Sequence, residues 1–333
     1  MKKMSKNNPA YPMPHEETQF SSPLDCVLWH LQNKNVSYDQ AEGACSAYAD
    51  QVVLGAGSAI ICLMVALFII TSNAAVLRRI IGTRHIHELV YLFTANLGIC
   101  DLLSGIGLLC YTASVVKPST NHEIMNNLTF LMFSQAMSVS GLSLMSINSY
   151  VAVKNPIFFY TRADDVKLYA RAAILSSWLA LSLLFALPGL GLNCLDAPTQ
   201  SCSGLYHTPL IGVLVIMFLL LASIIAFTNI STFRALKSRR ERRLGEKQPW
   251  QGEYEKGVRR AKAVMIHAVV AFISWTLPRV AVIMACHLGL ARCLLVTGPG
   301  CLVVLFVLNS AINPMASIIC SRIHGAKKSG KAT

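Results

Sequence analysis

Residues 89–116 read LVYLFTANLGICDLLSGIGLLCYTASVV, a long apolar run that contains one charged side chain, Asp101. An α-helix needs about 20 apolar residues to cross the hydrocarbon core of a bilayer, so this run is long enough to span a membrane. A carboxylate near the middle of such a helix is costly unless it is protonated or partnered. The stretch therefore predicts a membrane-spanning helix and makes Asp101 a candidate functional residue.

Six more segments of similar length and composition lie along the chain. Of the 333 residues, 54% are hydrophobic and only 14% are charged, whereas soluble domains carry about 25% charged residues. Spans of this length exclude an outer-membrane barrel, whose strands need about ten alternating residues. We therefore expect an all-α membrane protein, a multi-pass seven-helix bundle in the plasma membrane, with helices at about 51–77, 89–116, 124–153, 172–192, 207–233, 259–286 and 296–320.

The positive charges predict the orientation of this bundle. Most of the 29 Lys and Arg residues fall in the alternate connecting segments that follow the first, third, fifth and seventh spans, and such segments stay cytoplasmic. This places residues 1–50 outside, with an N-glycosylation acceptor at Asn35, and makes 234–262 a basic third cytoplasmic loop and 322–333 a short cytoplasmic tail. The net charge of +13 then reflects topology and attraction to the lipid bilayer, and no nucleic-acid partner is expected.

Two other spans carry polar residues that could partner Asp101. Ser134 and Ser138 are four residues apart on the third span, and the seventh span has the same spacing of two asparagines with a serine between them. These side chains could form a hydrogen-bonded network, or an oxygen cage for a structural sodium ion. A neutral, buried aspartic acid that joins helices remains the alternative. The cation set is Asp101, Ser138, Asn309, Ser310 and Asn313.

The sixth span contains Arg279, directly after Pro278. Proline kinks a helix and frees backbone carbonyls. Arg279 could face a wet outer cavity and bind an anionic or carbonyl-bearing ligand, or extend outward to lipid headgroups, and the sequence leaves both open. No nucleophile elbow, phosphate loop or metalloprotease motif is present in the sequence, so we expect neither catalytic residues nor, apart from the possible sodium ion, a cofactor.

Six cysteines fall in predicted outer segments, where an even number favours disulfide pairing. Cys194 with Cys202, and Cys286 with Cys293, would close short loops and are the expected pairs. Whether Cys26 bonds to Cys45 stays open. On the cytoplasmic side, residues 237–243 predict a basic extension of the fifth helix that touches lipid, docks a cytosolic partner, or does both.

Residues 52–322 contain four further motifs: Thr71-Ser72-Asn73, the Asn96–Leu103 segment with Asp101, Trp178, and the Asn309–Pro314 segment. Together these motifs resemble those of rhodopsin-like (class A) G-protein-coupled receptors. The resemblance implies a small-molecule or lipid ligand bound from the outer side between helices three, five, six and seven, and a heterotrimeric G protein as partner. Candidate ligand-binding residues are Asn126, Asn127, Leu128, Phe130, Gln135, Trp275, Thr276 and Arg279.

Within class A, the chain looks most like the lysophospholipid receptors and the neighbouring melanocortin, cannabinoid and adenosine group. Residues 192–207 resemble the second outer loop of sphingosine-phosphate and lysophosphatidate receptors, which closes on itself by a disulfide. The resemblance thus implies the pair Cys194–Cys202, and Cys286 with Cys293 resembles the third-loop bridge. The cation set around Asp101 also matches the family.

The activation motifs depart from the family pattern. Asn148-Ser149-Tyr150 replaces the acidic-Arg-aromatic motif, Ser317 replaces a tyrosine of the seventh helix, and Thr276 stands where the family has a tryptophan. Asn127 and Leu128 occupy the positions where sphingosine-phosphate receptors carry an Arg-Glu pair that clamps the ligand headgroup. We therefore expect weakened or atypical coupling; a non-coupling decoy, scavenger or dimerisation partner is the alternative. The G-protein-facing set is Asn148, Ser149, Tyr150, Arg239, Arg240 and Ser317.

Overall fold

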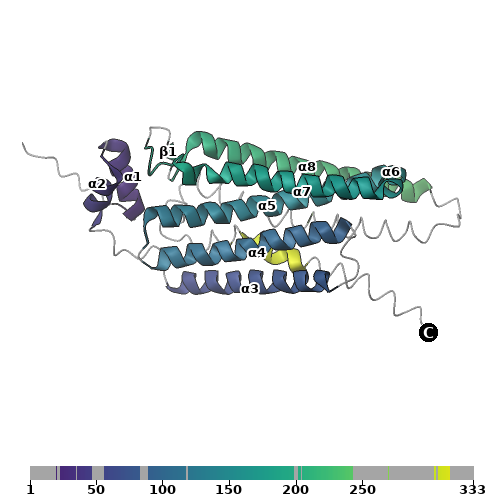
Figure 1. Ribbon diagram of the computed structural model, residues 1–333, viewed down its shortest axis with the longest axis horizontal. Helices are drawn as coiled ribbons and strands as arrows, with labels where there is room; N and C mark the ends of the chain where they lie inside the picture. Colours follow the sequence, from purple (N-terminus) through teal and green to yellow (C-terminus); the bar gives the residue numbers. More distant parts are fainter. Residues whose placement is uncertain are drawn as a thin grey trace, which may run out of the picture.

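Long apolar helices dominate the computed structural model of this chain (Figure 1). Among the described residues, five helices are long and apolar enough to cross a membrane: α3 (Ala56–Ile81), α4 (Leu89–Val116), α5 (Asn121–Lys154), α7 (Ala163–Ala186) and α8 (Thr208–Arg242). The structure describes residues 20, 23–34, 36–46, 56–82, 89–117, 119–198, 202–203, 205–242, 269, 304 and 307–315. The predicted span 259–286 and most of 296–320 lie outside this part.

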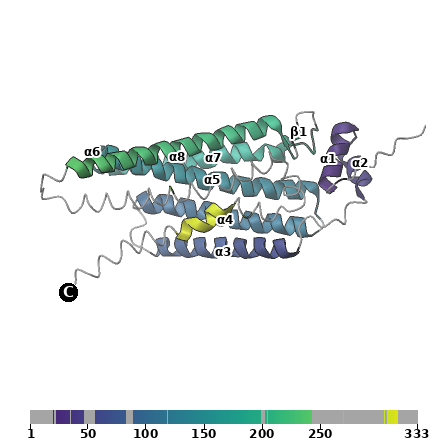
Figure 2. The same ribbon diagram turned by 180° about the vertical axis from the view of Figure 1, so that it is seen from behind.

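α5 is the central helix of the bundle. It packs against α4, α7 and α8, while α3 packs against α4. In its most apolar window 72% of α5 is buried, compared with 28% for α3, 22% for α7 and 11% for α8. The helical segment 307–315, the short yellow piece in Figure 2, crosses α4 and is bonded to α3, α4 and α5 through side chains described below. The outward faces of the peripheral helices are apolar, as contact with lipid requires.

Two glycines let α4 fit closely between its neighbours. A Cβ atom added at Gly105 would lie 2.7 Å from Cγ1 of Ile70 and 3.2 Å from the backbone oxygen of Ala66, both on α3. A Cβ atom at Gly107 would lie 3.1 Å from Cα of Leu131 on α5. Small residues at helix contacts in membranes allow backbones to approach closely, and these two set the spacing of α3, α4 and α5.

The fourth span differs from the expected range 172–192. α7 begins nine residues earlier, at Ala163, because Asp164 and Asp165 in its first turn stabilise the positive N-terminal end of the helix. It ends at Ala186 because Pro188 lacks an N–H, and a short 3-10 helix, η2 (Pro188–Leu190), follows. Gly191 then turns the chain with a left-handed φ of 96°.

Short elements lie at both ends of the bundle. α1 (Pro23–Asn33) and α2 (Tyr38–Ala44), which we call the N-terminal cap, lie at the same end as the hairpin β1 (Cys202–Ser203) and β2 (Tyr206–His207) (Figure 1). The sequence did not indicate these elements. α6 (Pro156–Thr161) lies at the opposite end, near the end of α8, which continues beyond residue 233 to Arg242. The predicted helical extension of the fifth span is therefore present in the structure.

The glycine contact predicts a matched difference in stability. Gly105→Ala would push a methyl group against α3, and overpacking of this kind costs about 1–3 kcal/mol. Gly212→Ala on α8 is the control, since a Cβ atom there meets no atom within 4 Å. We expect Gly105→Ala to lower the thermal midpoint of the purified protein by several degrees and Gly212→Ala to leave it unchanged. Equal midpoints for the two variants would contradict the close approach of α3 and α4.

Candidate functional site

Asp101 lies at the centre of a buried polar network. Its side chain is fully buried. Ser138 on α5 donates a hydrogen bond of 2.7 Å to Oδ1, and Nδ2 of Asn313 donates one of 2.8 Å to Oδ2. Burial of a carboxylate without such donors would be strongly unfavourable. Both oxygens of the acid are therefore held by groups from other helices.

The network continues from these donors to three more side chains. Asn309 Nδ2 donates to Ser138 Oγ at 3.2 Å, and Gln135 Nε2 donates to Ser310 Oγ at 2.9 Å. Asn73 on α3 donates to the backbone oxygen of Ser310 at 3.1 Å. Helices α3, α4 and α5 and the segment 307–315 are thus joined through one cluster. The structure brings the whole predicted cation set together, and it adds Asn73 and Gln135.

One acceptor in this cluster is left without a partner. Asn313 Oδ1 is buried and has no hydrogen-bond partner among the described residues. Asn313 lines a small crevice, with room for about one water molecule, together with Asp101, Asn73 and Thr94. Buried polar atoms in native proteins nearly always have a partner, often water or an ion. The crevice therefore has the chemistry of a small polar site.

A second bond joins two residues of the family-like motifs. Nε1 of Trp178 on α7 donates to Oδ1 of Asn96 on α4 at 2.9 Å. Phe133 on α5 packs edge-on against Trp178, with ring centroids 6.2 Å apart. This contact fixes α7 to the face of α4 and α5.

The predicted ligand residues on α5 have different surroundings. Asn126 is exposed, and Asn127 is half-buried and donates to the backbone oxygen of Cys110 on α4 at 3.5 Å. Leu128 packs against the apolar cluster that α1 and α2 form with Met125 and the following loop, and Phe130 is half-buried beside Phe133. Gln135, in contrast, is fully buried and belongs to the Asp101 network. The first four lie within one turn of each other near the cap, whereas Gln135 lies deeper.

Apolar side chains pack the N-terminal cap against one end of the bundle. Cys26 is bonded to Cys45, which joins α1 to the end of α2. Val27, Leu31 and other buried cap residues form one cluster with Met125 of α5 and Leu195 of the following loop. Ser37 caps α2: its side chain accepts from the backbone N–H of Gln40, and the Gln40 side chain accepts in return from Ser37 N–H. The cap therefore covers the end of α5 that carries Asn126 to Phe130.

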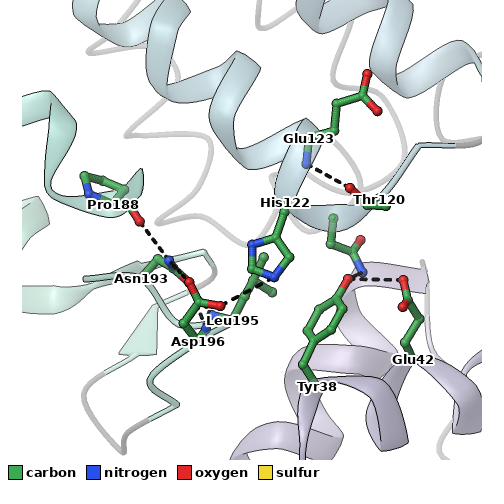
Figure 3. Close-up of polar contacts among 10 residues, drawn as sticks. Tyr38, Glu42, Thr120, His122, Glu123, Pro188, Asn193, Leu195 and Asp196 are labelled. Atoms are coloured by element: carbon green, nitrogen blue, oxygen red, sulfur yellow. Dashed lines mark hydrogen bonds and ion pairs between the residues drawn. The ribbon is translucent and has the colours of Figure 1, made fainter. Parts of the chain in front are cut away.

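Polar contacts also join the cap, the start of α5 and the loop that follows η2 (Figure 3). Tyr38 on α2 accepts from Asn121 on α5 and donates to Glu42, both at 3.1 Å, and its ring lies 4.9 Å from that of His122. Burial is the main cause of a raised pKa for Tyr38. His122 Nε2 lies 3.5 Å from Asp196 Oδ1 in the loop that follows η2. These contacts fix the cap and the loop to the start of α5.

The loop itself is closed by the disulfide Cys194–Cys202, the pairing that the sequence favours. Asn193 shapes its start: Oδ1 accepts from the backbone N–H groups of Leu195 and Asp196, and Nδ2 donates to the Pro188 oxygen at 2.8 Å. At its end, the Tyr206 hydroxyl lies 2.9 Å from Thr129 Oγ1 on α5. Burial raises the pKa of Tyr206 to about 12, so this hydroxyl stays protonated at physiological pH.

The described members of the predicted G-protein-facing set lie at the opposite end of the bundle. Ser149 is buried and donates to the backbone oxygen of Met145 on its own helix at 3.0 Å. Asn148 and Tyr150 are half-buried, and the Tyr150 ring lies 6.2 Å from Phe227 on α8. Arg239 and Arg240 lie in the last turns of α8.

The structure shows two features at this end that the sequence did not indicate. Asn229 on α8 donates to Ser146 Oγ on α5 at 3.3 Å, and Ile157 on α6 is 80% exposed. No pattern in the sequence pairs Asn229 with Ser146, because the bond depends on the relative rotation of two helices. Seven predicted residues lie outside the described part of the chain: Asn35, Trp275, Thr276, Arg279, Cys286, Cys293 and Ser317.

The apolar helices, the buried carboxylate and its amide and hydroxyl partners define a multi-pass helical membrane protein with a polar centre. Comparison with known families identifies the particular family within this class. The chain belongs to the rhodopsin family of seven-transmembrane receptors, whose sequence model, described as 7 transmembrane receptor (rhodopsin family), matches residues 72–316. It is therefore a G-protein-coupled receptor of the plasma membrane and not an enzyme, and its bundle has seven spans.

Two known receptors of this family align with most of the chain, and a third aligns with a shorter part of it. Sphingosine 1-phosphate receptor 1 of Danio rerio is 25% identical over 79% of this chain and 74% of its own length. Sphingosine 1-phosphate receptor 3 of Takifugu rubripes is 26% identical over 78% and 67%, respectively. G-protein coupled receptor 6 of Homo sapiens is 30% identical over a shorter region, 39% of this chain and 35% of the relative. The likeness to lysophospholipid receptors therefore extends along most of the bundle.

Two serines of α5 provide a matched test of the network. Ser138 and Ser134 are both fully buried, but Ser134 donates only to the backbone of its own helix, at Leu131, whereas Ser138 bonds Asp101 and Asn309. Ser138→Ala should destabilise the receptor by about 1–3 kcal/mol, because it removes a donor to a buried acid. Ser134→Ala should cost less. Equal thermal midpoints for the two variants in detergent would show that the Asp101 bond does not stabilise the bundle.

Proposed function

We propose that this receptor has its N-terminus outside, responds to a lipid-like extracellular ligand and couples weakly or atypically to heterotrimeric G proteins. The buried position of Ser149 carries the coupling part of the proposal. In the family this position holds an arginine, a long cation that reaches toward a G protein. Here a short hydroxyl is turned back to Met145 at 3.0 Å, so the side chain that would make this contact is missing.

A lipid-like ligand is supported by the relatives and by the cap. The named relatives are sphingosine 1-phosphate receptors, and the cap closes the end of α5 with apolar side chains. The ligand we propose carries a neutral polar head. Residues 124–135 of α5 include no charged side chain, and Asn127 and Leu128 stand where an Arg-Glu clamp would hold a phosphate. An apolar chain with an uncharged head fits these residues better than a phosphorylated one.

The distribution of positive charge supports the proposed orientation. The basic residues of α8, among which Arg234 and Lys237 are exposed, belong to the segment that the positive-inside rule assigns to the cytoplasm. The cap and the disulfide Cys194–Cys202 lie at the other end (Figure 1). Disulfides persist in oxidising surroundings, which supports an outer position for this end.

Restoring the cation tests the coupling proposal. Wild-type receptor and Ser149→Arg would be expressed in cells, and basal cyclic AMP and G-protein dissociation recorded. We expect wild-type activity slightly above that of mock-transfected cells and a several-fold rise in Ser149→Arg, because the arginine supplies the missing contact. Ser149→Ala, at matched surface expression, is the control and should behave as wild type. A strong wild-type signal that Ser149→Arg does not increase would contradict weakened coupling.

The same experiment addresses a second function, a non-coupling receptor-fold protein that acts as a decoy, scavenger or dimerisation partner. The observation in its favour is again the turned-in Ser149 beside the contact between Asn229 and Ser146, which joins α5 to α8. A silent wild type combined with a gain of signal in Ser149→Arg would favour this function over the first.

We also propose that the Asp101 cluster binds a sodium ion. The residues fit such an ion, because a carboxylate, the Ser138 hydroxyl and the unpartnered Oδ1 of Asn313 supply oxygen donors in one buried place. Hard cations prefer oxygen ligands. The bound ion would add a positive charge beside Asp101 and stabilise the form of the bundle in which these helices meet.

Sodium dependence of stability tests this site. Replacing choline chloride by sodium chloride at constant ionic strength should raise the thermal midpoint of the wild type by a few degrees, because an ion that binds only the folded form stabilises it. Asp101→Asn should abolish this rise, and Ser134→Ala should retain it. If Asp101→Asn keeps the sodium-dependent shift, the site is wrong.

A further inference from the structure

His122 stands where the N-terminal cap and the loop that follows η2 meet the start of α5 (Figure 3). Its ring lies 4.9 Å from the ring of Tyr38 on α2, and its Nε2 atom lies 3.5 Å from Oδ1 of Asp196 in the loop. The side chain of His122 is 34% exposed, so protons of the surrounding water reach it. One titratable imidazole therefore contacts both elements that cover this end of α5.

Asp196 is held in place for this contact. Asn193 Nδ2 donates to Oδ2 of Asp196 at 2.7 Å, and Asn193 Oδ1 accepts from the Asp196 backbone N–H at 2.9 Å. Asn193 is itself fully buried and also donates to the Pro188 oxygen. An ordinary surface ion pair is weak partly because two mobile side chains must be ordered to form it. Here the acid is already ordered, and its Oδ1 atom faces His122.

Tyr38 is fixed in a similar way. Its hydroxyl accepts from Asn121 on α5 and donates to Glu42 on α2. A cation within about 6 Å of the centre of an aromatic ring is attracted to it, and the His122 ring is inside that distance. A positive charge on His122 therefore strengthens its contact with the cap as well as its contact with the loop.

Histidine is the side chain that ordinarily changes charge between pH 5 and 8, whereas aspartate and glutamate titrate at lower pH and lysine and tyrosine at higher pH. Burial moves the pKa of Tyr38 further above this range. Two other histidines have different surroundings: His30 bonds the backbone oxygen of Cys26 within α1, and His207 lies beside Cys202. The remaining charged groups described on the cap and around the start of α5 are Lys34, Asp39, Glu42, Lys117 and Glu123, of which the last two pair with each other at 3.7 Å.

We infer that His122 is a pH sensor for the N-terminal cap: acidification charges its ring and tightens the cap and the loop on the end of α5. The charged ring gains an ion pair with Asp196 and a cation–π contact with Tyr38, and both contacts exist only while the two elements are packed on α5. Leu195, next to Asp196, belongs to the apolar cluster of the cap, so the loop and the cap are held together. Above pH 8 the neutral ring loses both gains, and the cap opens more often.

A tighter cap slows the exchange of a ligand at residues 126–130, which the cap covers. This consequence rests on the proposed ligand site, whereas the opening of the cap does not depend on any ligand or G protein.

Hydrogen exchange of the backbone amides measures how often the cap opens. The purified full-length receptor in detergent, without ligand, would be compared at pH 5.5 and pH 7.5, with rates corrected for the intrinsic pH dependence of amide exchange. We expect the amides of α2 to be about fivefold better protected at pH 5.5. His30→Gln, which removes the histidine of the cap itself, is the control and should keep this difference.

Three variants separate the charge of His122 from its shape. His122→Gln is neutral and should give low protection at both pH values, whereas His122→Arg is always charged and should give high protection at both. Asp196→Asn removes the partner in the loop and should lose most of the difference, which keeps the test decisive if a His122 variant folds poorly. The inference is overturned if wild-type protection does not rise at pH 5.5, if His122→Gln keeps the rise, if His122→Arg and His122→Gln are equally protected, or if His30→Gln abolishes the rise.

Discussion

The packing of this receptor depends on a single requirement: a carboxylate placed in the middle of a membrane-spanning helix must be given hydrogen-bond donors by other helices. Asp101 is fully buried, and its donors come from α5 and from the segment 307–315. Hydrogen bonds of 2.7 and 2.8 Å tolerate little change in rotation or depth of either helix. The acid therefore fixes the register of three helices, and Asn73 brings in a fourth through the Ser310 backbone.

Close packing and this polar cluster depend on each other. Short bonds from α4 to α5 require that the helices approach closely, and Gly107 removes the side chain that would prevent it at Leu131. Gly105 does the same toward α3. In lipid, where the hydrophobic effect between helices is absent, such contacts and interhelical hydrogen bonds supply much of the association energy. The short motif that provides the acid also lies within one turn of the glycines that make its network possible.

The sequence predicted those features that depend on one helix at a time. α4 has the same bounds as the apolar run, Leu89–Val116, because the composition of that run alone decides where a helix crosses hydrocarbon. α7 begins before its apolar run, because charged first-turn residues extend a helix beyond the lipid. The cap could not be predicted, since α1 and α2 are short and are held by the Cys26–Cys45 disulfide and by contacts with α5 and the Cys194 loop. Tertiary contacts of this kind leave no local pattern.

In the site, too, the sequence predicted which face of a helix is polar, but not which neighbouring helix each polar side chain contacts. The spacing of Ser134 and Ser138 identified a polar face of α5, but it could not show that Ser138 reaches Asp101 while Ser134 bonds only its own helix. Gln135 was assigned to a ligand, and the structure joins it to Ser310, because sequence spacing gives a face and not a neighbour. At the other end, the contacts of Ser146 with Asn229 and of Tyr150 with Phe227 hold α5 against α8 through neutral groups. Any separation of these two helices at this end must break these contacts, and Ser149, which is neutral and bonded to its own helix, adds no ionic contact to them.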